Sequence, residues 1–351
     1  MPLLQVGSTM NRINIPLLTF LALNLPFVTM LAQPSWYNRL DSIVSHSEGG
    51  IQDTQVLGYD SSGQIKCIVF LAKDVMADRY TVVKEERFIQ KDNESQITRT
   101  SYDSTEHGTH ITEEITKCDD QHRVASRIYR DVFESGTKDM MKETYTYSDS
   151  LLTTYRKYIN ADEQWHLQLT RTMTYTEHRH DISCILESVT NHEGHLIPYF
   201  KTNYTYTSPY GLLSSATYQS STDGQTWNTF RQVYYQYNQD NQQRCITTVT
   251  AAQDTMQTYI AYDNHGNIIQ QTIYDIKGGI PTWQQTIVYT YRLDIESTDI
   301  RGYDARTDTT DIPVPGYKPN HPLICSIVYD KDGIIEETRY YYSKHRLNES
   351  K

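Results

Sequence analysis

The sequence predicts an all-β fold: an elongated, twisted antiparallel meander of about ten ~30-residue β-hairpin repeats with a short N-terminal helix. Three observations favour this fold. The 351 residues include 29 tyrosines, and tyrosine together with threonine suits pleated, half-exposed strands. Only 38% of the residues are hydrophobic and the mean hydropathy is −0.62, which indicates a thin sheet with a large solvated face. Turn-like clusters also recur along most of the chain.

The clearest unit runs from Tyr259 to Tyr291. Apolar and aromatic residues alternate in its two ends, as in strands whose every second side chain points to one face. The segment Asp263-Asn-His-Gly266 between them predicts a tight turn, because glycine accepts a positive φ and Asp or Asn bonds to the local backbone. A second turn is predicted at Gly278-Gly279. One unit is therefore a hairpin.

Similar units start at Tyr59 and Tyr329, each with the pattern Tyr-Asp-x-x-Gly-x-Ile. Degenerate turns follow at a spacing of about 30 residues, which lies in the range of repeat architectures. Their anchors are Phe88, Cys118, Tyr147, Tyr175, Tyr206 and Tyr237.

A recurring tryptophan supports the repeat spacing. Trp165, Trp227 and Trp283 each follow a turn-like cluster and precede the next anchor by the same interval. Each tryptophan is therefore predicted to mark the start of a return strand. A single hairpin is marginal in water, so neighbouring hairpins must cover one another's apolar side chains.

The N-terminal part differs from the rest. Residues 1–32 resemble a secretory signal peptide, with Met10 as the expected start, a positive Arg12 and an apolar run to Ala32. An uncleaved anchor is the alternative. Residues 33–55 are predicted to form a helical lead or cap, because apolar residues between 35 and 47 fall at helical spacing. Such a helix would cover the first open strand edge.

The repeat domain is predicted to span residues 56–345. Residues 297–321 are rich in Pro and Asp, so they form a long loop rather than a strand, and long loops often carry function. Residues 346–351 form a short charged tail. A β-propeller is the alternative fold, since two hairpins make one four-stranded blade.

The units at Tyr59, Tyr262 and Tyr329 resemble the YD-type (Rhs-like) β-hairpin repeats of secreted bacterial proteins. The version with Trp and Tyr-x-Tyr resembles uncharacterised exported repeat proteins of Bacteroidetes. The resemblance covers residues 56–345 loosely. It implies an antiparallel sheet that winds or coils, in some members as a shell.

The net charge and the sequence motifs argue against several classes of function. A net charge of −11 without a basic cluster argues against nucleic acid and anionic membranes as partners. The five cysteines are far apart, which argues against a zinc site. No metal or cofactor is expected, since the histidine pairs lack a metalloprotease spacing. The pairs are His107 and His110, His178 and His180, and His192 and His195.

The sequence therefore predicts an exported, non-catalytic binding or scaffold protein of the bacterial envelope. Its location is periplasmic, outer-membrane-associated or extracellular, and its mature chain has no membrane span. The partner is a glycan or an envelope protein, because Tyr and Trp combine apolar area with a polar atom. One alternative is a glycan-active hydrolase with carboxylates near residues 297–321, and another is an inert spacer. The predicted ligand contacts are Trp165, Trp227, Trp283, Tyr237 and Tyr289.

Overall fold

The structure, a computed structural model, describes residues 36–47, 52–74, 79–102, 109–177, 181–207, 211–295, 300–301 and 319–346. The predicted signal peptide lies outside these residues, as do most of the predicted loop at 297–321 and all but the first residue of the tail at 346–351. All the regular elements within these residues are strands. They are β1 (Trp36–Ser47), β2 (Gln52–Tyr59), β3 (Ile65–Asp74), β4 (Arg79–Lys91), β5 (Glu94–Tyr102), β6 (Thr109–Cys118), β7 (Val124–Phe133), β8 (Gly136–Ser148), β9 (Leu151–Ala161), β10 (Gln164–Tyr175), β11 (Ile182–Thr190), β12 (Leu196–Tyr206), β13 (Leu213–Ser220), β14 (Asn228–Tyr237), β15 (Gln243–Thr250), β16 (Thr255–Tyr262), β17 (Ile268–Lys277), β18 (Ile280–Tyr291), β19 (Ile300–Arg301), β20 (Leu323–Asp330) and β21 (Gly333–Arg346).

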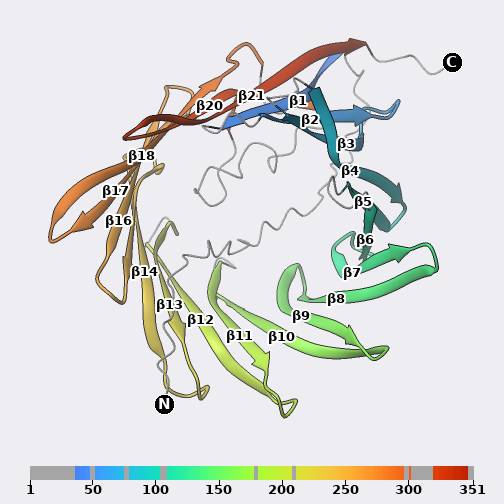
Figure 1. Ribbon diagram of the computed structural model, residues 1–351. Helices are drawn as coiled ribbons and strands as arrows, with labels where there is room; N and C mark the ends of the chain where they lie inside the picture. The colour runs from blue at the N-terminus through green and yellow to red at the C-terminus, as the bar shows by residue number, and fades with distance from the viewer. Residues whose placement is uncertain are drawn as a thin grey trace, which may run out of the picture.

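The strands form a closed antiparallel barrel (Figure 1). Each strand of the wall pairs with the next one along the chain, except that β18 pairs directly with β20, and β1 pairs with β21 over eleven residue pairs. The two-residue β19 is an addition that runs parallel to β1, so twenty of the 21 strands make the wall. The predicted open meander is therefore wrong, and so is the propeller. Closure removes both sheet edges, which an open sheet would leave unpaired.

The predicted N-terminal helix is also wrong, because residues 36–47 form strand β1. The apolar spacing that indicated a helix has another cause. A β-bulge at Asp41 shifts the register between Leu40 and Ser42, so that Leu40 and Ile43 both face the core although they are three residues apart. Pairing with β21, almost 300 residues away, is invisible to a local pattern.

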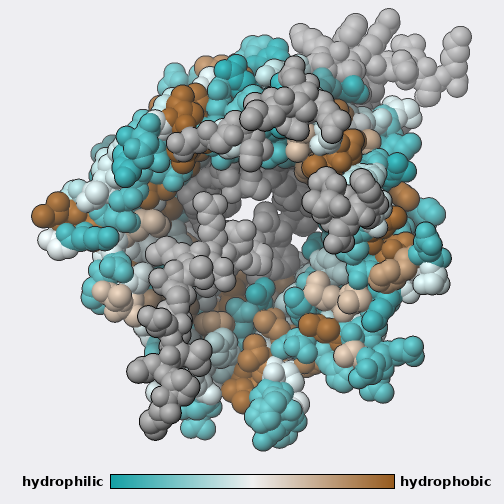
Figure 2. All heavy atoms as spheres, in the orientation of Figure 1, coloured by the Kyte–Doolittle hydropathy of each residue, from teal (hydrophilic) through white to brown (hydrophobic). Residues whose placement is uncertain are grey.

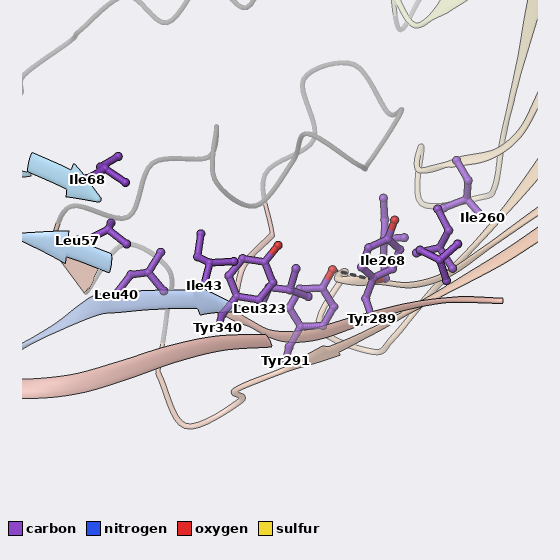
Figure 3. Close-up of a cluster of buried hydrophobic side chains, with 12 residues drawn as sticks. Leu40, Ile43, Leu57, Ile68, Ile260, Ile268, Tyr289, Tyr291, Leu323 and Tyr340 are labelled. Carbon is purple, nitrogen blue, oxygen red and sulfur yellow. Dashed lines mark hydrogen bonds between the residues drawn. The ribbon is translucent and has the colours of Figure 1, made fainter. Parts of the chain in front are cut away.

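The main core lies on the concave face of the wall (Figure 3). Its side chains come from β1–β3, β16–β18, β20 and β21, where the first and last hairpins meet. Leu40 and Ile268 are 0% exposed and Leu323 is 1% exposed. A second, smaller cluster is formed by Leu152, Tyr155 and Met173.

The two ends of the barrel differ. We call the end where β8 passes to β9 the tyrosine end, and the end where β9 passes to β10 the rim end. At the tyrosine end, four turns share one geometry: an Asp or Asn side chain accepts bonds from the backbone N–H groups two and four residues later, and the residue at the third position has a positive φ. The four capping residues are Asp60, Asp119, Asn238 and Asp263.

These turns confirm the predicted turns after Tyr59, Cys118, Tyr237 and Tyr262. The Tyr329 unit is different, although its sequence matches. Asp330 pairs directly with Gly333 in a two-residue turn, and this turn lies at the rim end because β20 runs in the direction of the odd-numbered strands.

Eight tyrosines at the tyrosine end make one recurring contact. Each hydroxyl donates a hydrogen bond to a backbone carbonyl near the start of the hairpin's first strand, and seven of the eight bonds span 2.6–2.9 Å. The pairs are Tyr59 with Leu40, Tyr147 with Val124, Tyr175 with Leu152, Tyr206 with Ile182, Tyr237 with Leu213, Tyr262 with Gln243, Tyr291 with Ile268 and Tyr342 with Leu323. The contact ties the two strands of each hairpin together.

Candidate functional site

The inner wall between β4 and β11 carries alternating charges. Ile68 faces the concave side (Figure 3) and pairs with Glu86, which pairs with Arg99, so all three share that face. Arg99 lies 3.1 Å from Glu86 and 2.9 Å from Glu114. Arg127 then lies 3.7 Å from Glu114. Each charge in this series has an opposite partner, which favours a role in holding the wall together.

Further along the wall, tyrosines take part in the same series. Glu143 accepts hydrogen bonds from the Tyr145 and Tyr155 hydroxyls at 2.8 and 2.7 Å. Burial, together with the nearby Glu143, raises the pKa of Tyr155 well above the ordinary phenol value. Arg171 continues the series, 2.8 Å from Glu187. These partners leave the phenols neutral and hydrogen-bonded, so we assign them a structural role.

Part of the outer wall between the two ends is polar, as on β5. On β5 the outward positions are Gln96, Thr98 and Thr100, since Ile97 and Arg99 face inward. Figure 2 shows hydrophilic and hydrophobic residues interspersed around the ring. This alternation is typical of an antiparallel sheet with one face in water. Among the described residues, none form a helix with the length and apolar character of a membrane span.

The rim end is flared, and several of its strands carry β-bulges. Figure 1 shows the hairpins β7–β8, β9–β10, β11–β12 and β17–β18 splaying away from the barrel axis. Six even-numbered strands each carry one unpaired residue near this end, which bends a strand and increases its twist. The unpaired residues are Val83, Met140, Gln168, Tyr199, Phe230 and Gln284.

The flared rim is also where exposed apolar side chains gather. Val83, Met140, Tyr199 and Phe230, all unpaired bulge residues, are 36–39% exposed. Sequence reasoning did not identify them. A bulge breaks the alternation of a strand by one residue, but without the pairing register that break cannot be told from ordinary variation.

All three tryptophans of the predicted ligand contacts lie at this rim. Trp165 is the second residue of β10, Trp227 directly precedes β14 and Trp283 is the fourth residue of β18. The predicted position at the start of return strands is therefore confirmed. Trp165 and Trp283 are 37% and 38% exposed, whereas Trp227 is half-buried.

Two of these tryptophans face outward. Trp165 pairs with Asn160, which lies an odd number of residues after the inward-facing Tyr155. Trp283 pairs with Tyr274 and therefore shares its face of the sheet. Tyr274 lies three residues after Gln271, so these two side chains point to opposite faces. Gln271 pairs with Ile260, which faces the concave side in Figure 3.

The three tryptophans are evenly placed along the wall. β10, β14 and β18 are four strands apart, and since neighbouring strands lie about 4.8 Å apart, the tryptophans are separated by about 19 Å or more. Each has polar neighbours: the Trp283 indole N–H donates to Thr286 at 2.9 Å, and the Lys201 ammonium lies 5.9 Å from the Trp227 ring. The series is a set of spaced aromatic faces on a polar surface.

The structure separates the other two predicted contacts from this rim. The Tyr237 hydroxyl donates to the Leu213 carbonyl at the tyrosine end. Tyr289 is 3% exposed and belongs to the main core. Both lie on the inner face, away from the tryptophans.

The remaining candidate residues do not converge. In the described part of the chain, no group of three or more His, Cys, Asp or Glu side chains is placed to hold a metal ion. His192 and His195 lie on an exposed turn, 3.8 and 3.6 Å from Glu193. All five cysteines are free thiols. His107, His178 and His180 lie outside the described residues.

Comparison with known proteins shows likeness to solved structures alone. No family model and no curated protein matches the sequence. A porin-like protein from Bacteroides uniformis is 11% identical, with a TM-score of 0.33, over 87% of this chain and 98% of that one. The Photorhabdus luminescens Tc holotoxin pore is 12% identical, also with a TM-score of 0.33, over 84% of this chain and 14% of that one. The TcdB2-TccC3 complex is 14% identical, with a TM-score of 0.27, over 87% of this chain and 19% of that one. At these values we draw no functional argument from the matches.

Proposed function

We propose that this chain is an exported, non-catalytic binding protein of the bacterial envelope that holds an extended glycan along its flared rim. One observation carries the proposal: Trp165, Trp227 and Trp283 recur every fourth strand at a single end of the barrel. An exposed indole offers a flat apolar face with a polar edge, which suits the faces of sugar rings. The signal-peptide-like pattern in residues 1–32 supports export.

The spacing favours a polymer over a small sugar. A mono- or disaccharide cannot contact two tryptophans that lie about 19 Å apart along the wall. A longer chain can reach a second and a third tryptophan, and each further contact is then intramolecular. Affinity is therefore expected to rise with the length of the glycan.

Intrinsic fluorescence titration with soluble polysaccharides tests the proposal. We expect each of Trp165→Ala, Trp227→Ala and Trp283→Ala to weaken binding by roughly 3- to 10-fold, because each removes one aromatic face. The triple variant should lose measurable binding in affinity electrophoresis, which does not depend on the indole signal. Phe133→Ala is the matched control, since Phe133 is 51% exposed at the same rim but lies outside the tryptophan series.

Equal binding by the triple variant and the wild type would refute the proposal, as would a lack of binding to every glycan in a broad panel. Release of new reducing ends from a bound glycan would instead support the hydrolase hypothesis, with carboxylates near residues 297–321.

A further inference from the structure

Arg231, on β14 of the inner wall, has no opposite charge beside it in the part of the chain that the structure describes. The inward-facing Arg99, Arg127 and Arg171 each have a carboxylate partner. The Arg231 Nε, like the Nε of Arg127, is buried and has no hydrogen-bond partner among the described residues. A buried N–H group is costly unless a hydrogen-bond acceptor compensates it.

The surroundings of Arg231 hold its guanidinium in place without neutralising it. Its Cζ lies 3.9 Å from the centroid of the Tyr218 ring, a distance typical of a cation–π contact. Tyr218 and Thr250 are its register partners on the two neighbouring strands. The Thr250 hydroxyl is likewise buried and without a partner among the described residues. Two unpaired donors therefore lie side by side.

Both residues line an open depression of about 300 Å³ at the rim end. Thr229, Gln232 and Gln253 complete its polar lining. Thr229 follows Trp227 by two residues, so the depression and the middle tryptophan of the series lie at the same end of the barrel.

We propose that Arg231 and Thr250 form an oxyanion subsite, and that the glycan held at the rim is acidic. A carboxylate or sulfate group accepts hydrogen bonds from both donors, and its charge neutralises the guanidinium. This inference rests on the proposed function for the polymer. The anion site itself rests on the Arg231 geometry alone.

Small probes test the anion site without reference to a polymer. Thermal unfolding is measured with sodium glucuronate, sodium sulfate and, as a neutral sugar, glucose. We expect glucuronate or sulfate to raise the Tm of the wild type and glucose to leave it unchanged. Arg231→Gln should abolish the rise. Arg244→Gln, which removes the same charge from an exposed position, should retain it.

The response to the two anions distinguishes a carboxylated sugar from a sulfated one. No rise with either anion, or the same rise in Arg231→Gln as in the wild type, would overturn the proposed site.

Polymers test the link to the rim. Binding is compared between an acidic glycan (an oligouronate or a sulfated oligosaccharide) and a neutral glycan of equal length. Arg231→Gln should weaken binding of the acidic glycan at least about tenfold and leave binding of the neutral glycan unchanged. Added salt should weaken the acidic complex alone. If the tryptophan variants lose binding while Arg231→Gln behaves as wild type, the acidic subsite fails and the proposed function stands. If the small anions stabilise the protein but no glycan binds, the proposed function fails and the anion site stands.

Discussion

At the scale of single residues, the abundance of tyrosine has a structural cause. Eight tyrosines bond across a hairpin at the tyrosine end, and each such bond contributes about 0.5–1.5 kcal/mol. Others, such as Tyr129, lie against carboxylates of the inner wall. Phenylalanine would fill the same space but would leave these carbonyls and carboxylates without a donor.

Neutral, half-buried phenols predict sensitivity to alkali. Burial, with nearby carboxylates, raises the pKa of Tyr129 and of Tyr206 to about 12 from the ordinary value of 10.0. Since the unfolded chain ionises first, stability is intact below pH 10 and falls as the pH rises from 10 to 12. Urea unfolding at pH 9, 10, 11 and 12 measures the fall.

The Tyr129→Phe/Tyr206→Phe double variant should be less stable than the wild type at pH 9 and should lose less of its remaining stability up to pH 12. Tyr234→Phe is the control, because Tyr234 is 42% exposed. A double variant with the same pH dependence as the wild type would contradict the assignment.

At the scale of elements, turns and bulges shape the hairpins. Carboxylate or amide caps tighten several turns, four of them at the tyrosine end, and unpaired residues introduce β-bulges near both ends of the strands. In the turn at Asp263, the carboxylate accepts from the His265 and Asn267 backbone N–H groups and from the Asn267 side chain, at 2.8–2.9 Å. These bonds lower the pKa of Asp263 although burial opposes them.

Asp263→Ala should therefore destabilise the protein by about 1–3 kcal/mol at pH 7, because three bonds to a charged acceptor are lost. Asp263→Asn should cost less, since Asn238 caps the corresponding turn between β14 and β15. Chemical denaturation of both variants provides the measurement. Equal losses for Ala and Asn would show that the side-chain oxygen is not what stabilises this turn.

At the scale of the whole molecule, closure between β1 and β21 defines the fold. Ser45 and Thr338 are register partners with hydroxyl oxygens 2.8 Å apart. In an open meander these residues would lie at opposite ends of the sheet. Closure also brings the first and last hairpins into one core.

A disulfide tests closure directly. In a variant whose five cysteines are replaced by serine, Ser45→Cys with Thr338→Cys should crosslink under mild oxidation. The bond should stabilise the fold by about 2–4 kcal/mol, because it restricts the unfolded chain. Non-reducing electrophoresis and peptide mass spectrometry detect it. Failure to crosslink, when a Leu57→Cys/Ile68→Cys pair within the β2–β3 hairpin does so, would contradict a closed barrel.

Local patterns predicted much of this protein. Alternating side chains with Gly, Asn and Asp between them identified strands and turns such as those around Asp263, because these depend on neighbours within a few residues. The tryptophan spacing likewise predicted the starts of β10, β14 and β18. The matching Tyr329 unit lies at the other end of the barrel, because its strand direction depends on the topology that precedes it.

The sequence by itself determined the strands, most of the turns and the presence of spaced tryptophans, since all of these follow from local geometry. Only the tertiary structure decided that the sheet closes, that Trp165 and Trp283 face outward, and that Tyr237 and Tyr289 face inward. It alone placed Arg231 beside Thr250. These features depend on register and on the pairing of β1 with β21, in which one added residue or one distant partner changes the face or the edge that a side chain occupies.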